Sequence, residues 1–314
     1  MIFRIVNFLV AFLYSFILAF YLPIDGFKDR ENYLTYADNS LFFLLRYTEN
    51  GVSSFFANEP FFLFFNYFLS LFFIPETVLR LFIFIPALLF SYSLLNADRR
   101  NFFWLLLVLL LPQVMKNHVM QLRQGFAVGV FVFAWFMVQG KKKWMLFLLT
   151  PFIHSSMFVV LTLLVFINIL KYLKFSVGIR NLAVFLLGLV ASIGLIYLAT
   201  LLGARQGVRY EDVATNISGM AFLFWSVVLI LFLIQKSSFL ETHIFALSNL
   251  IFYLTLYFFF PLSARIFESA LIFVLLAGLA LRGKFKLVFL FLFLFYFIYQ
   301  YYINLQKPFL GMGV

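Results

Sequence analysis

The chain has 314 residues, of which 65% are apolar and 11% are charged, and its formal net charge is +11. A soluble domain is usually about half apolar and a quarter charged, so this composition excludes an ordinary soluble fold. The basic residues stand in short clusters between apolar runs, where they orient loops and meet lipid headgroups, so the charge does not indicate nucleic-acid binding. The chain has no cysteine, which excludes disulfides, thiolate catalysis and cysteine-based metal sites.

Apolar runs follow one another along the chain, and the first is long enough to be retained as a helix rather than cleaved as a signal peptide. A spanning helix needs about 20 apolar residues, and uninterrupted runs favour helices over alternating barrel strands. We therefore predict an all-α, polytopic transmembrane helix bundle that forms a single membrane domain over residues 1–314, with about 10 or 11 membrane segments. The predicted segments are residues 3–22, 61–74, 78–95, 102–115, 122–139, 144–170, 181–202, 219–235, 243–260, 262–281 and 285–303.

Several of these runs are too short or too interrupted to cross a bilayer alone. Runs 61–74 and 102–115 are short, and run 144–170 is interrupted by Pro151 and His154. Irregular or polar backbone at membrane depth needs partners from protein or water. We therefore expect some segments to be re-entrant or broken.

The distribution of charge predicts the orientation of the chain. The basic cluster at residues 141–143 and a second one at 282–286 should be cytoplasmic. Residues 24–59 hold six of the twelve acidic residues and three basic ones, and should form the one larger extracytoplasmic loop. Residues 203–218 should form a second loop on that side, and the N-terminus should lie inside.

The sequence lacks the common signatures of soluble enzymes. It has no phosphate-binding loop, no dinucleotide-binding glycine pattern and no nucleophile elbow. It also has neither a D-x-D nor an H-x-x-x-H pattern, which disfavours zinc-dependent chemistry. We expect neither a metal site nor a cofactor.

Four arginines lie beside apolar runs: Arg123, Arg205, Arg209 and Arg265. A charge placed in the bilayer costs about 2.5–3.5 kcal/mol on insertion scales, so each needs a reason. Each could extend to the headgroups or pair with an acid, as Arg265 could with Glu268. The alternative is a shared site, since guanidinium groups bind phosphate oxygens in a bidentate manner. Four arginines together indicate a diphosphate ligand.

Two further residues are candidates for acid–base chemistry. His154 lies within an apolar run, where an imidazole is rare; it is either functional or a neutral group that donates to a backbone carbonyl freed by Pro151. Glu59 directly precedes an apolar run, so it either caps that helix or presents a carboxylate at the membrane interface.

Four short segments in a fixed order resemble those of EpsG/Wzy-type polysaccharide polymerases, and a weaker match at Arg209 and Tyr210 extends the order. The position after the histidine and the single helix before the acidic segment depart from the usual pattern. The four segments are Asp29-Arg30-x-x-Tyr33-x-x-Tyr36, Glu59-Pro60-x-Phe62, Arg123-Gln124-Gly125-x-Ala127 and His154-Ser155-Ser156.

The resemblance implies a multi-pass enzyme of the bacterial inner membrane that polymerises oligosaccharide repeat units carried on undecaprenyl diphosphate, on the outer side and without a metal. The acceptor sugar hydroxyl would attack the donor glycosyl diphosphate. Membrane lipids would surround the protein, and flippase and chain-length regulator proteins are candidate partners; no nucleic acid is expected. A flippase or transporter of lipid-linked glycans, and a ligase that transfers the glycan to a different acceptor, remain alternatives.

The same resemblance implies roles for individual residues. His154 or Glu59 would act as the base. Fixed guanidinium groups would stabilise the leaving diphosphate. The residues expected to bind the substrate are Arg123, Gln124, Arg205, Arg209, Tyr210, Arg265, Asp29, Arg30 and Tyr33.

Overall fold

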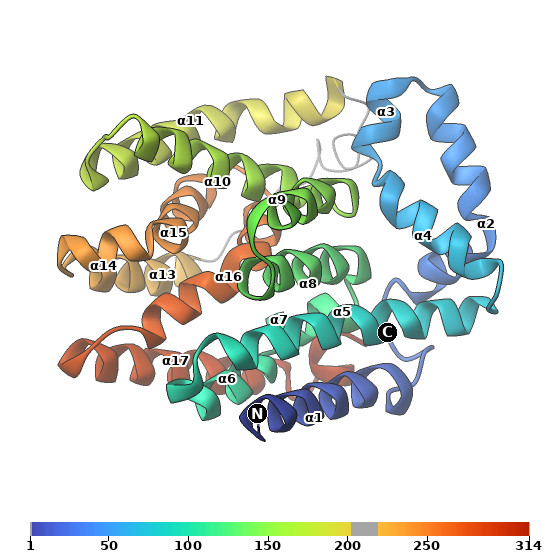
Figure 1. Cartoon of the computed structure of the whole chain (residues 1–314), viewed down its shortest axis with the longest axis horizontal. Coiled ribbons are helices and arrows are strands. Elements are labelled where there is room, and N and C mark those ends of the chain that lie inside the picture. Colours follow the sequence, from blue (N-terminus) through green and yellow to red (C-terminus); the bar gives the residue numbers. More distant parts are fainter. Residues whose placement is uncertain (1, 202–218, 314) are drawn as a thin grey trace. The chain divides into compact units, whose positions relative to one another are not determined.

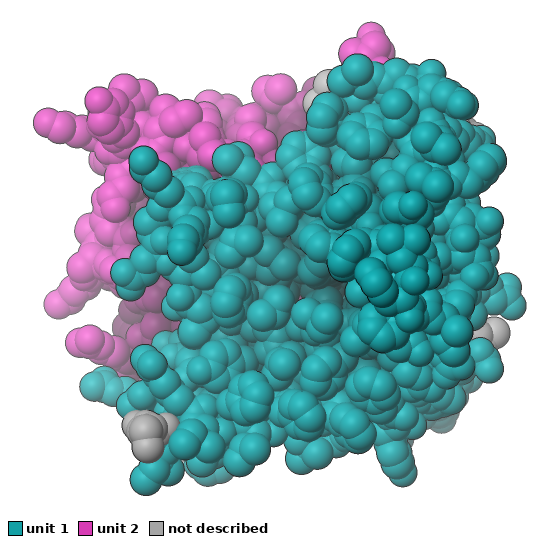
Figure 2. Space-filling view, turned by 45° about the vertical axis from the view of Figure 1, so that its right-hand side comes forward, with its two compact units in different colours: residues 1–157, 295–314 teal, residues 158–294 magenta. Residues whose placement is uncertain are grey.

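The computed structural model describes residues 2–201 and 219–313, and within these ranges the chain is helical, with an isolated bridge between Phe27 and Gly313 as its only β pairing (Figure 1). The chain divides into two compact units, which Figure 2 colours separately: residues 1–157 with 295–314, and residues 158–294. The prediction of a single membrane domain is not tested by this division and stays a prediction.

The first unit contains the helices of the N-terminal half and the end of the chain. Its helices are α1 (Ile2–Phe16) with a π-helical extension (Ile17–Tyr21), α2 (Arg30–Glu49), α3 (Val52–Ala57), α4 (Pro60–Ser70), α5 (Pro75–Ala97), α6 (Phe102–Leu109), α7 (Pro112–Val119), α8 (Leu122–Met137) and α9 (Gly140–Leu149). Short 3-10 turns cover Arg99–Asn101, Thr150–Phe152 and Pro308–Gly311.

Two helices continue from one unit into the other, and the remaining ones belong to the second unit. The continuous helices are α10 (Ser156–Tyr172) and α17 (Gly283–Asn304). The helices of the second unit are α11 (Val177–Leu201), α13 (Gly219–Leu233), α14 (Ser237–Thr242), α15 (Ile244–Leu256) and α16 (Ser263–Leu279).

The helices confirm the predicted all-α membrane fold. By length and composition, four helices among the described residues can cross a membrane: Ile2–Tyr21, Pro75–Ala97, Val177–Leu195 and Gly283–Asn304. Five shorter apolar helices of 10–17 residues accompany them. The protein is therefore a multi-pass membrane protein.

The expected breaks also occur. The run at 102–115 is divided at Pro112 into two helical pieces, Arg99–Leu109 and Pro112–Val119, which meet at 66°. The run at 144–170 is divided by the 3-10 turn Thr150–Phe152, which contains Pro151. Proline has no N–H to donate, so helical hydrogen bonding is interrupted at both points. Before Pro112, Leu111 is also extended, as expected for a residue that precedes proline.

The acidic segment 24–59 is more ordered than the predicted loop, because α2 and α3 occupy most of it. Tyr33, Tyr36, Ala37 and Ser40 are buried along one side of α2, at helical spacing. The acidic residues that suggested a loop lie mainly on the other side of the helix. The segment is therefore an amphipathic helix, which its low mean hydropathy alone does not reveal.

Helix α5 packs against α1 and α8 in the first unit. The buried Asn7 side chain of α1 donates to the Leu95 carbonyl at 3.0 Å, and Arg80 of α5 donates to the Ala19 carbonyl at 2.7 Å. These two contacts, at opposite ends, fix α1 and α5 as antiparallel neighbours. On α8, a Cβ at Gly129 would approach the Pro86 carbonyl to 2.8 Å, so glycine allows α5 and α8 to come close.

A second glycine, Gly125, sets the contact between α7 and α8, and its replacement should destabilise the fold. A Cβ at this position would lie 2.0 Å from the Asn117 backbone carbonyl oxygen. We expect Gly125→Ala to lower the stability by about 1–3 kcal/mol, because the backbone must move. The melting temperature of the purified protein in detergent measures this effect.

Gly194 provides the matched control, because it also lies inside a helix but nothing lies within 4 Å of a Cβ there. Gly194→Ala should be neutral or slightly stabilising, since alanine favours helix over glycine. Equal melting temperatures for the two variants would contradict the proposed close approach of α7 and α8.

Candidate functional site

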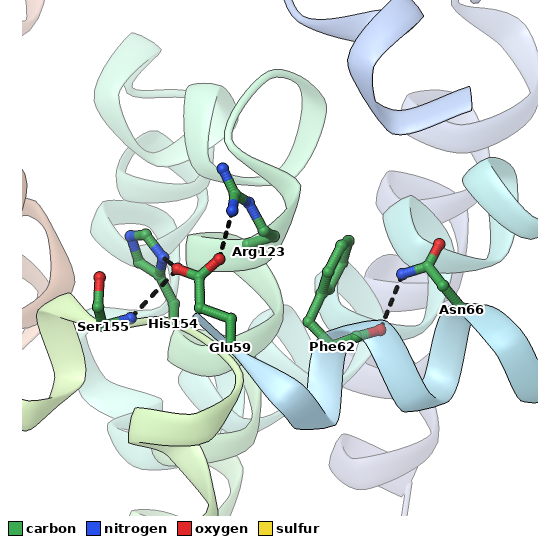
Figure 3. Close-up of polar contacts among 6 residues, drawn as sticks. All are labelled: Glu59, Phe62, Asn66, Arg123, His154 and Ser155. Carbon is green, nitrogen blue, oxygen red and sulfur yellow. Dashed lines mark hydrogen bonds and ion pairs between the residues drawn. The ribbon is translucent and has the colours of Figure 1, made fainter. Parts of the chain in front are cut away.

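The carboxylate of Glu59 is the centre of a buried polar cluster in the first unit. One oxygen, Oε2, accepts from an Nη1–H of Arg123. The other, Oε1, lies 2.5 Å from Nδ1 of His154 and accepts from the backbone N–H of Ser155 at 3.3 Å. Figure 3 shows Arg123 on one side of the carboxylate and His154 with Ser155 on the other. The structure thus brings together three segments that are far apart in the sequence.

Helix α4 positions Glu59. Phe62, in the first turn of α4, is buried against the rings of Tyr33, Tyr36 and Phe82. Glu59 itself has φ 63° and ψ 52°, a left-handed conformation that costs a non-glycine residue about 1–2 kcal/mol. Its side chain makes no hydrogen bond to cap α4, so the capping role considered from the sequence is not realised. Such strain is typical of functional positions, where the surrounding structure holds a residue in an unfavourable conformation because its side chain is needed there.

Arg123 enters the cluster as the second residue of α8, which begins directly after the turn at Met120 and Gln121. Its guanidinium lies over the ring of Tyr36, with Cζ 5.5 Å from the ring centre, and it also interacts with the Tyr33 hydroxyl. Its Nε is buried and has no hydrogen-bond partner in the structure. Arg123 is therefore held by the Glu59 carboxylate, the Tyr36 ring and the Tyr33 hydroxyl. Its Nε–H remains available to donate to a further group.

His154 enters from the break between α9 and α10. Its backbone N–H donates to the Thr150 carbonyl at 3.0 Å, and the Thr150 hydroxyl donates to the Phe147 carbonyl at 2.8 Å. The turn around Pro151 therefore carries its own hydrogen bonds, and the imidazole contacts Glu59 rather than a freed carbonyl. Because a carboxylate only accepts, Nδ1 carries a proton, and in the neutral form of the imidazole Nε2 is left as an acceptor.

The charges around Glu59 hold its carboxyl in the ionised form. Burial alone would raise its pKa, but Arg123 and then His154 outweigh burial and lower the pKa from 4.5 to about 2. The Ser155 N–H acts in the same direction. A carboxylate with so low a pKa is a weak base, so its arrangement suits orienting the imidazole more than accepting a proton.

Arg30 supplies a second guanidinium, which is buried and has no acidic partner within the described ranges. It is 4% exposed, stacks over Phe27 at 5.1 Å, and its Nε and Nη1 lack hydrogen-bond partners. Burial, and to a smaller extent the charge of Arg80, lower its pKa to about 10, so it remains cationic at neutral pH. Tyr33 acts in the opposite direction, and the same tyrosine interacts with Arg123. An unpaired buried cation is costly, and an anionic ligand would relieve that cost.

The remaining predicted residues fall in different places. Tyr33 and Gln124 are buried in the first unit, whereas Asp29 is exposed and accepts from the Asn32 side chain at 3.3 Å. Arg265 lies on α16 in the second unit, half-buried. The predictions for Arg205, Arg209 and Tyr210 lie outside the described residues.

Two contributors to the cluster were not assigned a role from the sequence. Tyr36 follows Tyr33 by three residues, and this spacing on a helix was the available signal that both rings face the same site. The Ser155 N–H is a backbone group, so no side-chain pattern could reveal it. Among the described residues, no group of three or more His, Cys, Asp or Glu side chains could hold a metal ion.

The low pKa of Glu59 predicts a stability difference that depends on pH. The ionised carboxylate stabilises the folded state fully above its ordinary pKa of 4.5, and this contribution is lost as the pH falls from 4.5 towards 2. Glu59→Gln should therefore be less stable than the wild type at pH 6, and the difference should shrink by pH 3. Melting temperatures of both proteins in detergent across this range test the effect.

Glu49→Gln is the matched control, because Glu49 is exposed at the end of α2. It should stay close to the wild type at every pH. A Glu59→Gln difference that is constant from pH 6 to pH 3 would contradict the ion-paired state of the carboxylate.

Comparison with known proteins places the chain in a family. Neither the curated proteins nor the solved structures that were searched gave a match. A model described as the EpsG family matches residues 4–312, nearly the whole length, including all three segments that meet at Glu59. The chain therefore belongs to the EpsG family.

Proposed function

We propose that the protein is a membrane glycosyltransferase that polymerises oligosaccharide repeat units carried on undecaprenyl diphosphate, at the outer face of the bacterial inner membrane. Membership of the EpsG family suggests a polysaccharide polymerase. The observation that carries the proposal is the contact of Glu59 with both His154 and Arg123, because it puts an imidazole and a guanidinium beside one buried carboxylate.

His154 is the base in this proposal. The carboxylate of Glu59 holds Nδ1–H, which fixes the ring and leaves Nε2 able to accept a proton. The acceptor sugar hydroxyl is a weak nucleophile until a base within hydrogen-bond reach takes its proton. Glu59 then serves as a positioning residue, and its contact stabilises the imidazolium that forms.

Arg30 and Arg123 bind the diphosphate in this proposal. The charge of Arg123 is balanced by Glu59, whereas Arg30 is buried and unpaired. Tyr33 interacts with both guanidinium groups, so the two cations share one neighbourhood. A diphosphate leaving group develops negative charge as the glycosyl bond breaks, and fixed guanidinium groups stabilise it.

The proposed step is a direct transfer. The acceptor hydroxyl oxygen forms a bond to the anomeric carbon of the donor, and the bond from that carbon to the phosphate oxygen breaks. The hydroxyl proton passes to Nε2 of His154, and undecaprenyl diphosphate leaves with the electron pair of the broken bond. The diphosphate linkage supplies the driving energy.

Reconstitution tests the proposal directly. Lipid-linked oligosaccharides extracted from cells that lack the protein would be added to liposomes that contain the purified wild type. We expect a ladder of products that differ by one repeat unit. His154→Gln should lower the initial rate by about 100-fold or more, which is the usual contribution of a general base. Arg30→Gln should also slow polymerisation, and Arg30→Lys should restore it only in part, because lysine lacks the bidentate fork.

Arg46→Gln is the control for lost charge, because Arg46 is exposed on the same helix as Arg30. It should produce the wild-type ladder. A single transfer by the wild type would instead identify a ligase, and no new linkage would identify a transporter. A full ladder from His154→Gln at the wild-type rate would contradict the assigned base.

A further inference from the structure

A cavity outside the proposed site lies where the start of α1 meets the end of α5. Its volume is about 630 Å³, and it is lined by Arg4, Ile5, Phe8, Tyr92 and Arg99. It is open to the surroundings, since all of these residues except Tyr92 are exposed. The polymerase chemistry uses none of these residues, so their arrangement needs a separate explanation.

Buried contacts between α1 and α5 hold the walls of this cavity together. Asn7 is fully buried, and its side-chain amide donates to the Leu95 carbonyl at 3.0 Å and to the Asn96 side chain at 3.1 Å. The rings of Phe8 and Tyr92 meet edge to face, with 6.1 Å between their centres. The cavity is therefore a fixed feature of the helix pair.

Two uncompensated cations line the cavity. Arg4 and Arg99 form no ion pair within the described part of the chain, and the Arg99 guanidinium lies 4.7 Å from the centre of the Phe3 ring. The nearby carboxylate of Asp98 accepts instead from the Arg100 backbone N–H and the Asn101 side chain. The cavity thus combines two guanidinium groups that lack an ion-pair partner among the described residues with aromatic and aliphatic walls.

The position of the cavity along the helices places it at a membrane surface. Both α1 and α5 belong to candidate membrane spans, and a 20-residue helix is about 30 Å long. Arg80 and Ala19 meet at the other end of the same helix pair. Arg4 and Arg99 therefore lie at the membrane boundary on the opposite side, where lipid phosphates are found.

We propose that this cavity binds the phosphate headgroup of an anionic glycerophospholipid in the leaflet that surrounds the N-terminal end of α1. The two guanidinium groups would hold the phosphate oxygens, as arginine does in bidentate contacts. An acyl chain would follow the exposed apolar residues Leu9 and Phe12 along α1. A soluble phosphate would match the charges but would leave the apolar walls and this stripe uncovered, which favours the lipid.

Native mass spectrometry of the full-length protein in detergent tests the proposal. Phosphatidylglycerol and phosphatidylcholine with the same acyl chains would be added at equal concentrations. We expect the wild type to retain phosphatidylglycerol selectively, and Arg4→Gln/Arg99→Gln to bind it at least 10-fold more weakly. Excess inorganic phosphate should not displace the lipid.

The control is Arg46→Gln/Arg100→Gln. It removes the same charge from positions that are exposed, as Arg4 and Arg99 are, but that do not line the cavity. It should bind phosphatidylglycerol as the wild type does, and melting temperatures would check that both variants fold. The proposal would be overturned if the wild type retained phosphatidylglycerol and phosphatidylcholine equally, and this comparison needs no variant. Equal loss in both double variants, or displacement by inorganic phosphate, would overturn it as well.

Discussion

The buried carboxylate of Glu59 is the group on which the rest of the site depends. A charge out of water is tolerated only when other charges and hydrogen bonds replace the solvent. Arg123, His154 and the Ser155 N–H do so for Glu59, and each comes from the start of a helix or from a helix break. Removal of the carboxylate would leave the Arg123 guanidinium without its acidic partner and would release the imidazole.

This dependence explains why helix breaks matter in a chain that is otherwise almost entirely helical. A continuous membrane helix satisfies its backbone internally and presents mainly apolar side chains. The turn between α7 and α8 and the turn at Pro151 interrupt that pattern. Arg123 and His154 each lie two residues after one of these turns. Polar groups can gather at these points because the chain there is covered by neighbouring protein.

Much of the fold could be predicted from the sequence, because spans follow from the length of apolar runs. The runs at 78–95 and 122–139 correspond to α5 and α8, and the interruption near Pro151 was visible as a proline within an apolar segment. The helices in residues 24–59 could not be predicted from mean hydropathy, since only their periodicity marks a buried side. In the site, the order of Glu59, Arg123 and His154 was readable. Their contact was not, because it depends on how α4, α8 and the Thr150–Phe152 turn pack.

The account makes one central claim, that Glu59 acts by holding His154 and Arg123 in place rather than by taking the proton itself. A double-mutant cycle on the initial rate of polymerisation tests it most directly, with Glu59→Gln, His154→Gln and the double variant compared with the wild type. If Glu59 works through His154, the double variant should be no slower than the slower single variant. Losses that multiply in the double variant would show that the two residues act independently and would contradict the claim.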